Sequence, residues 1–211
     1  THFVTQQELR GTGDAVRTAL EGFLRAGHKF DVGEEIIILN GDLPLVRKET
    51  VDYFLKECRR KNLDSAAMSF GTNNPTGFGR IIRDMRGVFS FIREEKDASP
   101  EEKKIREVNS GVYYFKSHVL VSALEKINNK NSQNEFYLTD TLGSQSGFLS
   151  EAIRCPFKWD LSGVNTAYEL ALVRSLAQAR LQKKLSEELG VSFADTLSVF
   201  VSARAQFAGP C

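Results

Sequence analysis

Apolar and polar positions along the 211-residue chain follow two periods. Apolar residues three and four apart share one face of a helix, whereas short apolar runs bounded by turn formers are typical of strands. Four stretches have helical spacing: residues 12–27, 48–60, 118–127 and 166–189. Four runs predict strands and one segment predicts a hairpin: residues 36–39, 65–70, 108–115, 152–155 and 79–93. This alternation predicts an α/β fold, a mainly parallel sheet with helices on both faces.

The run at residues 36–39 ends abruptly in Asn-Gly-Asp-Leu-Pro at residues 40–44. This sequence places Asp42 just beyond the carboxyl end of a strand, where open α/β sheets bind their ligands. A carboxylate at such a place commonly holds Mg²⁺ on the phosphates of a nucleotide. Asp42 could equally cap the helix that begins near Lys48 or simply turn the chain. The stretch alone leaves both interpretations open.

Composition narrows the class of protein. With 41% hydrophobic residues the chain can build a core, and its net charge of +1 gives no electrostatic case for nucleic acid or an acidic membrane. No apolar run has the length needed to span a bilayer. The three cysteines are few and widely spaced, which favours a reducing compartment, the cytoplasm, over a disulfide framework or a metal site. They are Cys58, expected to be a buried structural thiol, Cys155 and Cys211.

Six loop segments carry residues that could bind a ligand, and most of them have an equally simple structural explanation. They are residues 10–15, 75–80, 94–98, 109–111, 135–140 and 163–165. Five of the segments could be explained by helix capping, a plain turn, solvated charges or a helix start. In this explanation Asn165 is the N-cap of the last helix. The Asn-Ser-Gly at residues 109–111 interrupts an apolar strand and is harder to explain structurally.

The order of these segments is more specific than any one of them. Gln6 is followed by Gly-Thr-Gly at 11–13, Asn-Gly-Asp-Leu-Pro at 40–44, Pro-Thr-Gly-Phe-Gly-Arg at 75–80, Glu-Glu-Lys-Asp-Ala at 94–98, Asn-Ser-Gly at 109–111, Glu-Phe-Tyr-Leu-Thr-Asp at 135–140 and Gly-Val-Asn at 163–165. From about residue 4 to residue 200 the series resembles one family. This is the uridyltransferase domain of the bifunctional N-acetylglucosamine-1-phosphate uridyltransferase and glucosamine-1-phosphate acetyltransferase.

The resemblance implies a Rossmann-like nucleotidyltransferase fold and transfer of a uridylyl group from UTP to N-acetylglucosamine 1-phosphate, with release of pyrophosphate. Such a reaction needs no protein nucleophile, because positioning and charge neutralisation carry an in-line displacement at phosphorus. By resemblance, the site residues have the following roles. Gln6, Gly11 and Thr12 would hold uracil; Asp42 and Asn165 would be catalytic and bind Mg²⁺; Gly79, Glu94 and Asn109 would contact the sugar, with Tyr137 and Thr139 beside them.

The sequence also departs from the family pattern. Arg10 stands where the family has Leu and Asp14 where it has His, which leaves nucleotide affinity and base preference open. The family opens with a Gly-rich phosphate loop that this sequence lacks, and residues 190–211 resemble the approach to a left-handed β-helix. We therefore expect residues 1–189 to be a nucleotidyltransferase domain truncated at its start, with little or no activity alone. Full-length relatives would form homotrimers.

Other interpretations remain possible. A sister sugar-nucleotidyltransferase could use another base or sugar, and a non-catalytic domain could bind a nucleotide sugar without turning it over. A glycosyltransferase is less favoured, because those enzymes usually carry Asp-x-Asp at the metal whereas this sequence has Asp-Leu-Pro at residues 42–44.

Overall fold

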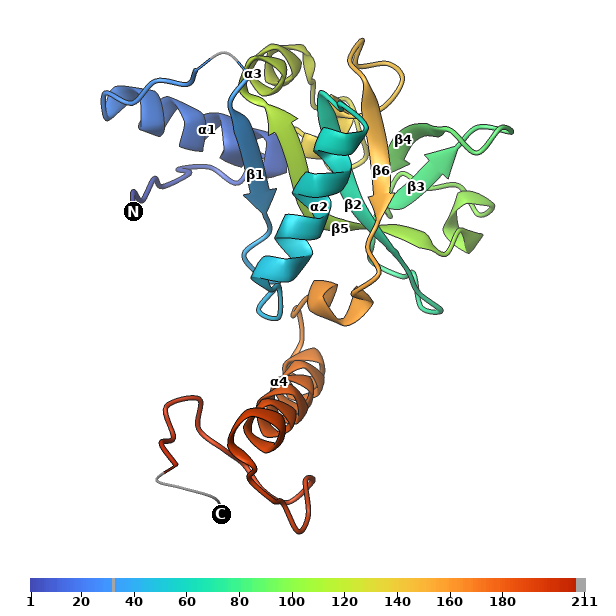
Figure 1. Cartoon of the computed structure of the whole chain (residues 1–211). Coiled ribbons are helices and arrows are strands. Elements are labelled where there is room, and N and C mark those ends of the chain that lie inside the picture. The colour runs from blue at the N-terminus through green and yellow to red at the C-terminus, as the bar shows by residue number, and fades with distance from the viewer. Residues whose placement is uncertain (32, 208–211) are drawn as a thin grey trace. The chain divides into compact units, whose positions relative to one another are not determined.

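The computed structural model describes residues 1–31 and 33–207, which fall into two compact units (Figure 1). One unit comprises Thr1–Asn40 and Arg47–Lys158, and the other comprises Gly41–Val46 and the chain from Trp159 onward. The helices are α1 (Thr12–Arg25), α2 (Lys48–Arg60), α3 (Ser117–Lys126) and α4 (Ala167–Leu189). The strands are β1 (Glu35–Leu39), β2 (Ser65–Gly71), β3 (Arg80–Arg83), β4 (Phe89–Arg93), β5 (Glu107–Lys116) and β6 (Ser150–Arg154).

All the predicted helices and strands are present, with bounds within two residues of those expected. The sequence did not predict three short 3-10 helices of the described chain. These are η1 (Glu102–Lys104), η2 (Leu138–Thr141) and η3 (Lys158–Leu161). Each is three or four residues long, too short to show an apolar period.

The six strands form a single mixed sheet in the order β4-β3-β5-β2-β6, with β1 also paired to β5. Strand β5 runs antiparallel to β1, β2 and β3, and β3 is antiparallel to β4. Only β2 and β6 pair in parallel among the described strands. The expected α/β class is right, but the expected predominance of parallel pairing is wrong. A buried run of Val and Tyr in β5 has the same composition whichever way its neighbours run.

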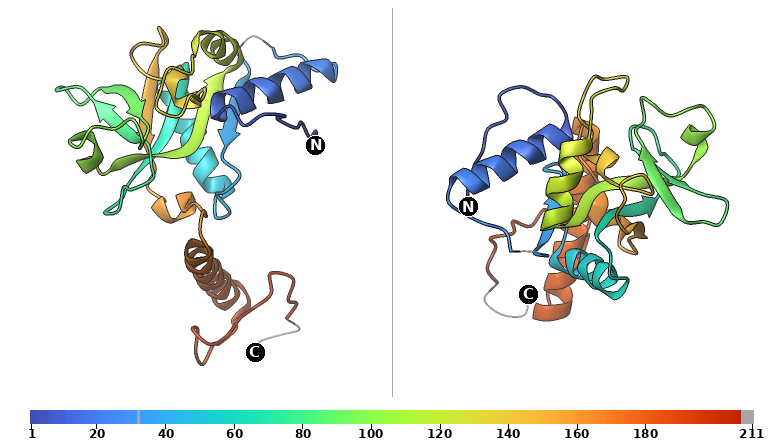
Figure 2. Two further views of the ribbon diagram at one scale, coloured as in Figure 1. Left: turned by 180° about the vertical axis from the view of Figure 1, so that it is seen from behind. Right: turned by 90° about the horizontal axis from the view of Figure 1, so that it is seen from above.

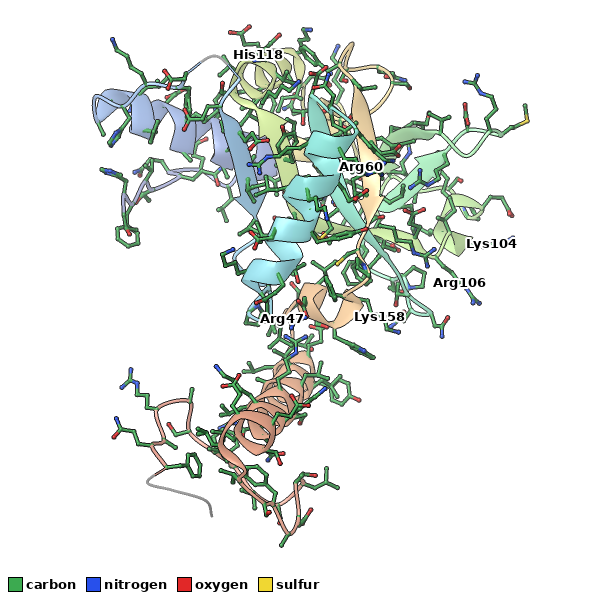
Figure 3. The ribbon with its side chains drawn as sticks, viewed as in Figure 1. Arg47, Arg60, Lys104, Arg106, His118 and Lys158 are labelled. Atoms are coloured by element: carbon green, nitrogen blue, oxygen red, sulfur yellow. The ribbon has the colours of Figure 1, made fainter. Side chains whose placement is uncertain are left out.

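Helices cover both faces of the sheet, as expected. Helix α2 lies in front of the sheet in Figure 1, and the view from behind in Figure 2 shows α1 and α3 on the opposite face. On the α3 face, Tyr113 and Phe115 of β5 pack with Leu120 and Leu124 of α3 in one buried cluster. Polar side chains are exposed on these helices at Arg60 of α2 and His118 of α3 (Figure 3).

Helix α2 buries Thr50, Phe54 and Cys58, which are four residues apart and therefore share one face. Burial raises the pKa of the Cys58 thiol to about 12, so this thiol stays protonated and unreactive at neutral pH. The expected structural role of Cys58 is thus confirmed. Cys155 is also a buried free cysteine, and Cys211 lies outside the described residues.

A bulge in β5 sets the geometry of the Asn-Ser-Gly segment. Pairing with β2 shifts register between Ala67 and Ser69, where residues 110–112 of β5 lie opposite Met68 alone. The Ser110 hydroxyl donates to the Met68 carbonyl at 2.8 Å, and Gly111 takes a left-handed φ of 79°. Before the bulge β5 pairs with β3, and after it β5 pairs with β1. Bulges of this kind re-aim side chains and recur beside functional sites.

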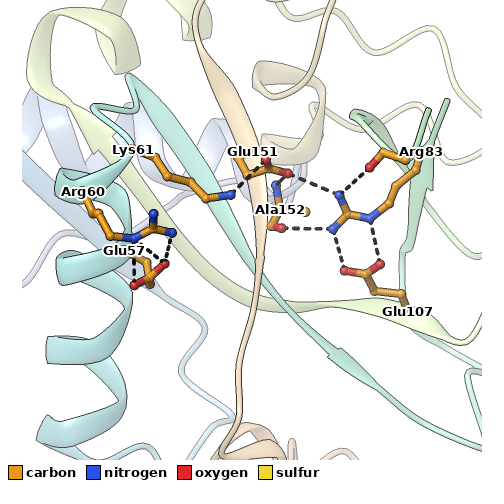
Figure 4. Close-up of polar contacts among 8 residues, drawn as sticks. Glu57, Arg60, Lys61, Arg83, Glu107, Glu151 and Ala152 are labelled. Atoms are coloured by element: carbon orange, nitrogen blue, oxygen red, sulfur yellow. Dashed lines mark hydrogen bonds and ion pairs between the residues drawn. The ribbon is translucent and has the colours of Figure 1, made fainter.

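Charged side chains connect strands β3, β5 and β6 (Figure 4). Arg83 at the end of β3 makes two 2.9 Å hydrogen bonds to Glu107 at the start of β5. The same guanidinium donates to Glu151 at 3.3 Å and to the Ala152 carbonyl at 3.1 Å, both on β6. Lys61, just after α2, lies 3.3 Å from Glu151. The network fixes the spacing of strands that are remote in sequence.

The second unit is organised around α4. Residues 191–207 fold back on this helix, where Leu185, Val191 and Val201 form a small buried cluster. The Gln182 amide donates to the carbonyls of Thr196 and Val199 at 3.0 and 2.8 Å. Gly190 ends α4 in the left-handed conformation, as predicted. No helix in the described part of the chain is both long and apolar enough to cross a membrane.

Candidate functional site

The β5 bulge presents Asn109 as a buried polar side chain with part of its hydrogen-bonding capacity unused. Its Nδ2 donates to the Tyr113 hydroxyl at 2.7 Å, and its Oδ1 accepts from the Gly111 N–H at 3.3 Å. Its backbone N–H donates to the Gly79 carbonyl at 2.8 Å. A side-chain amide has two donors and two acceptor positions, so one N–H and one lone pair remain for a ligand.

Gly79 brings Asn109 and Glu94 together. A methyl group built on Gly79 would lie 3.4 Å from Glu94 Oε2 and 3.5 Å from Asn109 Cβ, and only 3.0 Å from Ile92. Glycine at this position therefore lets Glu94 and Asn109 approach one point that a larger residue would crowd. These three predicted sugar contacts come from the start of β3, the end of β4 and the bulge of β5, and the structure does bring them together.

Thr139 completes this group. Its buried hydroxyl donates to Glu94 Oε1 at 2.7 Å, which leaves Oε2 without a hydrogen-bond partner among the described residues. Tyr137, two residues earlier, is oriented differently: its hydroxyl accepts from the Gln133 amide at 2.9 Å. Glu94 therefore has Thr139 as a direct partner, whereas the Tyr137 hydroxyl is engaged elsewhere.

Burial is the main influence on the Glu94 carboxyl and raises its pKa, because the charged form loses hydration. The nearby carboxylates of Asp140, Asp97 and Glu135 raise it further, while the Thr139 hydrogen bond opposes the shift. A carboxyl group whose ionisation is disfavoured by burial and by neighbouring carboxylates is typical of a functional site.

Glu94→Gln should therefore raise the free energy of unfolding at pH 7. Because the folded pKa lies above the unfolded value, ionised Glu94 costs stability above the folded pKa and nothing below the ordinary value of 4.5. The advantage of glutamine should thus fade as the pH falls below 4.5, which urea titrations at pH 4 and pH 7 would show. Glu102→Gln is the control of opposite sign, since hydrogen bonds from Ser99 lower the pKa of Glu102. A destabilised Glu94→Gln protein at pH 7 would contradict this prediction.

A buried ion pair holds the two loops in place. Arg80 is 1% exposed and its Nη2 lies 2.6 Å from Glu95 Oε2, while its Nη1 donates to the Phe78 carbonyl. Gly79 and Glu94 are the chain neighbours of this pair, so the ion pair fixes both of them. Neither Arg80 and Glu95 nor Tyr113 was predicted as part of the site. A lone Arg in a strand and a Tyr in an apolar run carry no local signal of these contacts.

The glycine loop at the start of α1 docks on the segment that carries Thr139. The Phe136 N–H donates to the Arg10 carbonyl at 2.7 Å, and the Gly13 N–H donates to the Phe136 carbonyl at 2.7 Å. The Thr12 hydroxyl accepts from the Leu138 N–H at 3.0 Å. Through residues 135–139 the structure thus connects the predicted base contacts of the glycine loop with the predicted sugar contacts around Glu94.

Gln6 lies at the same loop. Its side-chain Nε2 donates to Asp14 Oδ2 at 2.8 Å and, at a longer 3.4 Å, to the Gly11 carbonyl. Gln6, Gly11 and Thr12 are therefore neighbours, as the prediction required. Asp14, one of the departures from the family pattern, is in direct contact with Gln6.

The predicted metal ligands lie together in the second unit. A methyl group built on Gly163 would lie 3.4 Å from Asp42 Oδ2 and 3.9 Å from the Asn165 amide nitrogen, so both side chains approach one point. The Val164 N–H donates to the Asp42 carbonyl at 3.0 Å and fixes the two segments. Turning the Asn165 amide would offer its oxygen instead of its nitrogen.

The capping explanations for these two residues are wrong, whereas residues 41–42 do form a turn, the other structural explanation given for Asp42. The N-cap of α2 is Arg47, which has no side-chain capping bond, so Asp42 does not cap that helix. Helix α4 is capped by Thr166, whose hydroxyl accepts from the Glu169 N–H while Glu169 accepts from the Thr166 N–H, so Asn165 is not the cap. Asn165 lies one residue earlier and is exposed.

The donor set suits a hard cation that keeps most of its water. One carboxylate and one amide oxygen match the way Mg²⁺ binds, through one or two protein ligands together with phosphates and water. The described residues hold no cluster of three or more His, Cys, Asp or Glu side chains that could cage a metal by themselves. Asp42 and Asn165 thus fit a lightly held ion of this kind.

The sheet and its helices have a counterpart among solved structures. The fold is similar to the crystal structure of the nucleoside-diphosphate-sugar pyrophosphorylase from Vibrio cholerae RC9. The TM-score is 0.51 at 15% identity, over 71% of this chain and 59% of that one. This is the Rossmann-like nucleotidyltransferase fold that was expected.

Residues 1–145 match the nucleotidyl transferase family, so the chain belongs to that family. It is similar to the bifunctional protein GlmU of Fervidobacterium nodosum, with 38% identity over 200 residues, 93% of this chain and 41% of that protein. It is also similar to the bifunctional protein GlmU of Syntrophomonas wolfei, with 34% identity over 208 residues, 95% of this chain and 43% of that one. The chain thus spans about two fifths of the length of these relatives. The family resemblance found in the sequence is confirmed, and this family generally uses a divalent metal.

Proposed function

We propose that this nucleotidyl transferase moves a uridylyl group from UTP to N-acetylglucosamine 1-phosphate, releasing pyrophosphate and forming UDP-N-acetylglucosamine, with Mg²⁺ as its metal. The observation that supports this most strongly is the close approach of Gly79, Glu94 and Asn109, with Thr139 hydrogen-bonded to Glu94. Similarity to the two GlmU proteins favours the same reaction. The few, widely spaced cysteines favour a reducing compartment, and we place the protein in the cytoplasm.

The sugar contacts follow from the unused hydrogen-bonding capacity. Glu94 Oε2 accepts from sugar hydroxyls, since Thr139 occupies only Oε1. Asn109 offers one N–H and one lone pair, which match the carbonyl and the N–H of an N-acetyl group. Gly79 lets Glu94 and Asn109 come close together, because a methyl group there would touch both.

The base contacts lie at the glycine loop. Gln6 presents a side-chain amide, and Gly11 and Thr12 begin α1, whose amino-terminal N–H groups favour electron-rich partners. A base held there would be recognised through the Gln6 amide and the backbone groups of the glycine loop.

Asp42 and Asn165 would hold the Mg²⁺ ion through the carboxylate and the amide oxygen. When bound, such an ion neutralises phosphate charge and orients phosphate oxygens. The protein residues then act by position alone: they fix the sugar phosphate so that its oxygen attacks the α-phosphorus in line as pyrophosphate leaves.

Asn109→Ala should weaken binding of UDP-N-acetylglucosamine about tenfold while leaving binding of UMP nearly unchanged, because it removes one hydrogen-bonding partner of the sugar only. NMR titration of the 211-residue chain with the two ligands measures both affinities without requiring turnover. UDP-glucose serves as the comparison ligand, and the chain should prefer the N-acetyl sugar.

Equal losses for UMP and UDP-N-acetylglucosamine would mean that Asn109 is misassigned. Preference for another sugar or for an adenine nucleotide would favour a sister nucleotidyltransferase. Binding of neither nucleotide nor nucleotide sugar would contradict the proposed function.

A further inference from the structure

Gln6 differs from its neighbours in the first ten residues, because it alone among them is partly buried. Its side chain is held at the glycine loop by two acceptors. Asp14 Oδ2, in the first turn of α1, lies 2.8 Å from Gln6 Nε2, and the Gly11 carbonyl lies 3.4 Å from the same nitrogen.

These contacts fix which way the Gln6 amide points. A carboxylate and a carbonyl can only accept, so the end of the amide that faces Asp14 and Gly11 must be its nitrogen. Both side-chain N–H groups of Gln6 are then directed into the protein. The carbonyl oxygen Oε1 is left as the group that can meet a ligand, and it can act only as an acceptor.

Asp14 is itself fixed. Its Oδ1 lies 3.9 Å from Arg17 Nη1, one helical turn away. Arg17 Nη2 donates to the Leu124 carbonyl of α3 at 2.9 Å, and the guanidinium lies 5.1 Å from the ring centre of Phe136. The chain from Arg17 through Asp14 to Gln6 is thus anchored on α3 and on the segment that receives the glycine loop.

We propose that Asp14 is a specificity-determining positioning residue: it locks the Gln6 amide so that an acceptor faces the base. An acceptor at this place pairs with the N3–H of uracil and repels the N3 lone pair of cytosine. The inference rests on the proposed function for the contact between Gln6 and the base. Without Asp14 the amide could turn over and offer its N–H groups to cytosine instead.

The test compares binding of UMP and CMP to the 211-residue chain by NMR titration. Asp14→Asn keeps the shape of the side chain but can donate as well as accept, so it no longer dictates the orientation of Gln6. We expect the ratio of UMP to CMP affinity to fall about fivefold, the equivalent of one ordinary hydrogen bond. Glu21→Gln, the same chemical change at an exposed position two turns along α1, should leave the ratio unchanged.

A purely structural role for Asp14, such as stabilising the first turn of α1, would lower stability without changing that ratio. Gln6→Ala separates the role of Asp14 from the contact between Gln6 and the base. If Gln6→Ala abolishes the preference for UMP and Asp14→Asn does not, the role of Asp14 is overturned and the proposed base contact stands. If Gln6→Ala also leaves the preference intact, or the chain binds neither nucleotide, the base contact fails and the inference fails with it.

A second measurement needs no variant. In the wild-type chain the Gln6 side-chain N–H signals should exchange with water more slowly than those of the adjacent, exposed Gln7. Equal exchange at the two residues would show that Asp14 does not hold Gln6, and would overturn the inference.

Discussion

Gly11→Ala is expected to lower the free energy of unfolding by roughly 3 kcal/mol, the largest loss of stability that we expect at a predicted site residue. Gly11 has φ 102° and ψ 173°, a combination that only glycine adopts readily. A methyl group there would lie 2.7 Å from the Phe136 carbonyl oxygen and 2.9 Å from the Phe136 nitrogen. These are backbone atoms, so they cannot move aside without breaking the contact between the glycine loop and residues 135–138.

Gly27→Ala is the matched control at the other end of α1. Gly27 also has a positive φ, 84°, but a methyl group there would meet no atom within 4 Å. This variant should lose only the conformational term, about 1 kcal/mol. Urea unfolding of both variants gives the comparison, and the difference between them combines the steric contact with the costlier backbone conformation of Gly11. Equal losses at the two positions would show that the glycine loop does not dock on Phe136 as the structure describes.

Sequence alone is informative about features that depend on neighbouring residues. The apolar period placed α2 at residues 48–60, because an amphipathic helix with a well-formed apolar face carries its own bounds in the sequence. The hairpin of β3 and β4 was likewise local, with its turn at Asp84 and Gly87. Features that depend on a few neighbouring residues could therefore be predicted.

Features that depend on distant residues could not. The direction in which β1 and β2 run beside β5 leaves no trace in the composition of β5. The bulge does leave a sign, the Asn-Ser-Gly interruption at residues 109–111, but its geometry depends on pairing with β2. Gly79 and Glu94 lie at strand ends and Asn109 lies at the β5 bulge, and their meeting depends on the sheet order. Only the family resemblance suggested that they belong together.

The cap of α4 could have been identified from the sequence. Thr-Ala-Tyr-Glu at residues 166–169 has the spacing of a capping box, in which a Thr and a Glu three residues later satisfy each other's backbone N–H groups. That pattern identifies Thr166 rather than Asn165 as the cap, and the structure agrees. Because Thr166 is the cap, helix capping no longer explains Asn165, and this favours the hypothesis that Asn165 binds a metal.

Asp42→Ala is expected to abolish divalent metal binding at the point approached by Asp42 and Asn165, a loss of at least about tenfold in affinity. Asp42 supplies the charged ligand of the pair, and it lies in a turn outside the helices and strands of the fold. Its removal should therefore leave the fold intact. Mn²⁺ is a suitable paramagnetic substitute for Mg²⁺, because it broadens the NMR signals of nuclei close to it.

In the wild-type chain, Mn²⁺ should first broaden the backbone signals of residues 41–43 and 163–165. Glu188→Gln, which removes an exposed carboxylate of α4 in the same unit, should leave this pattern unchanged. Asn165→Ala should weaken the broadening less than Asp42→Ala does, since the amide ligand is neutral. It should also leave α4 as stable as before, because Thr166 provides the cap.

Two outcomes would count against this assignment. Unchanged broadening in a folded Asp42→Ala protein would exclude Asp42 as a ligand. A loss of about 1 kcal/mol in stability for Asn165→Ala, with metal binding intact, would return Asn165 to a purely structural role. Because Thr166 already caps α4, stability and metal binding report on Asn165 independently, and the two roles can be separated in one pair of measurements.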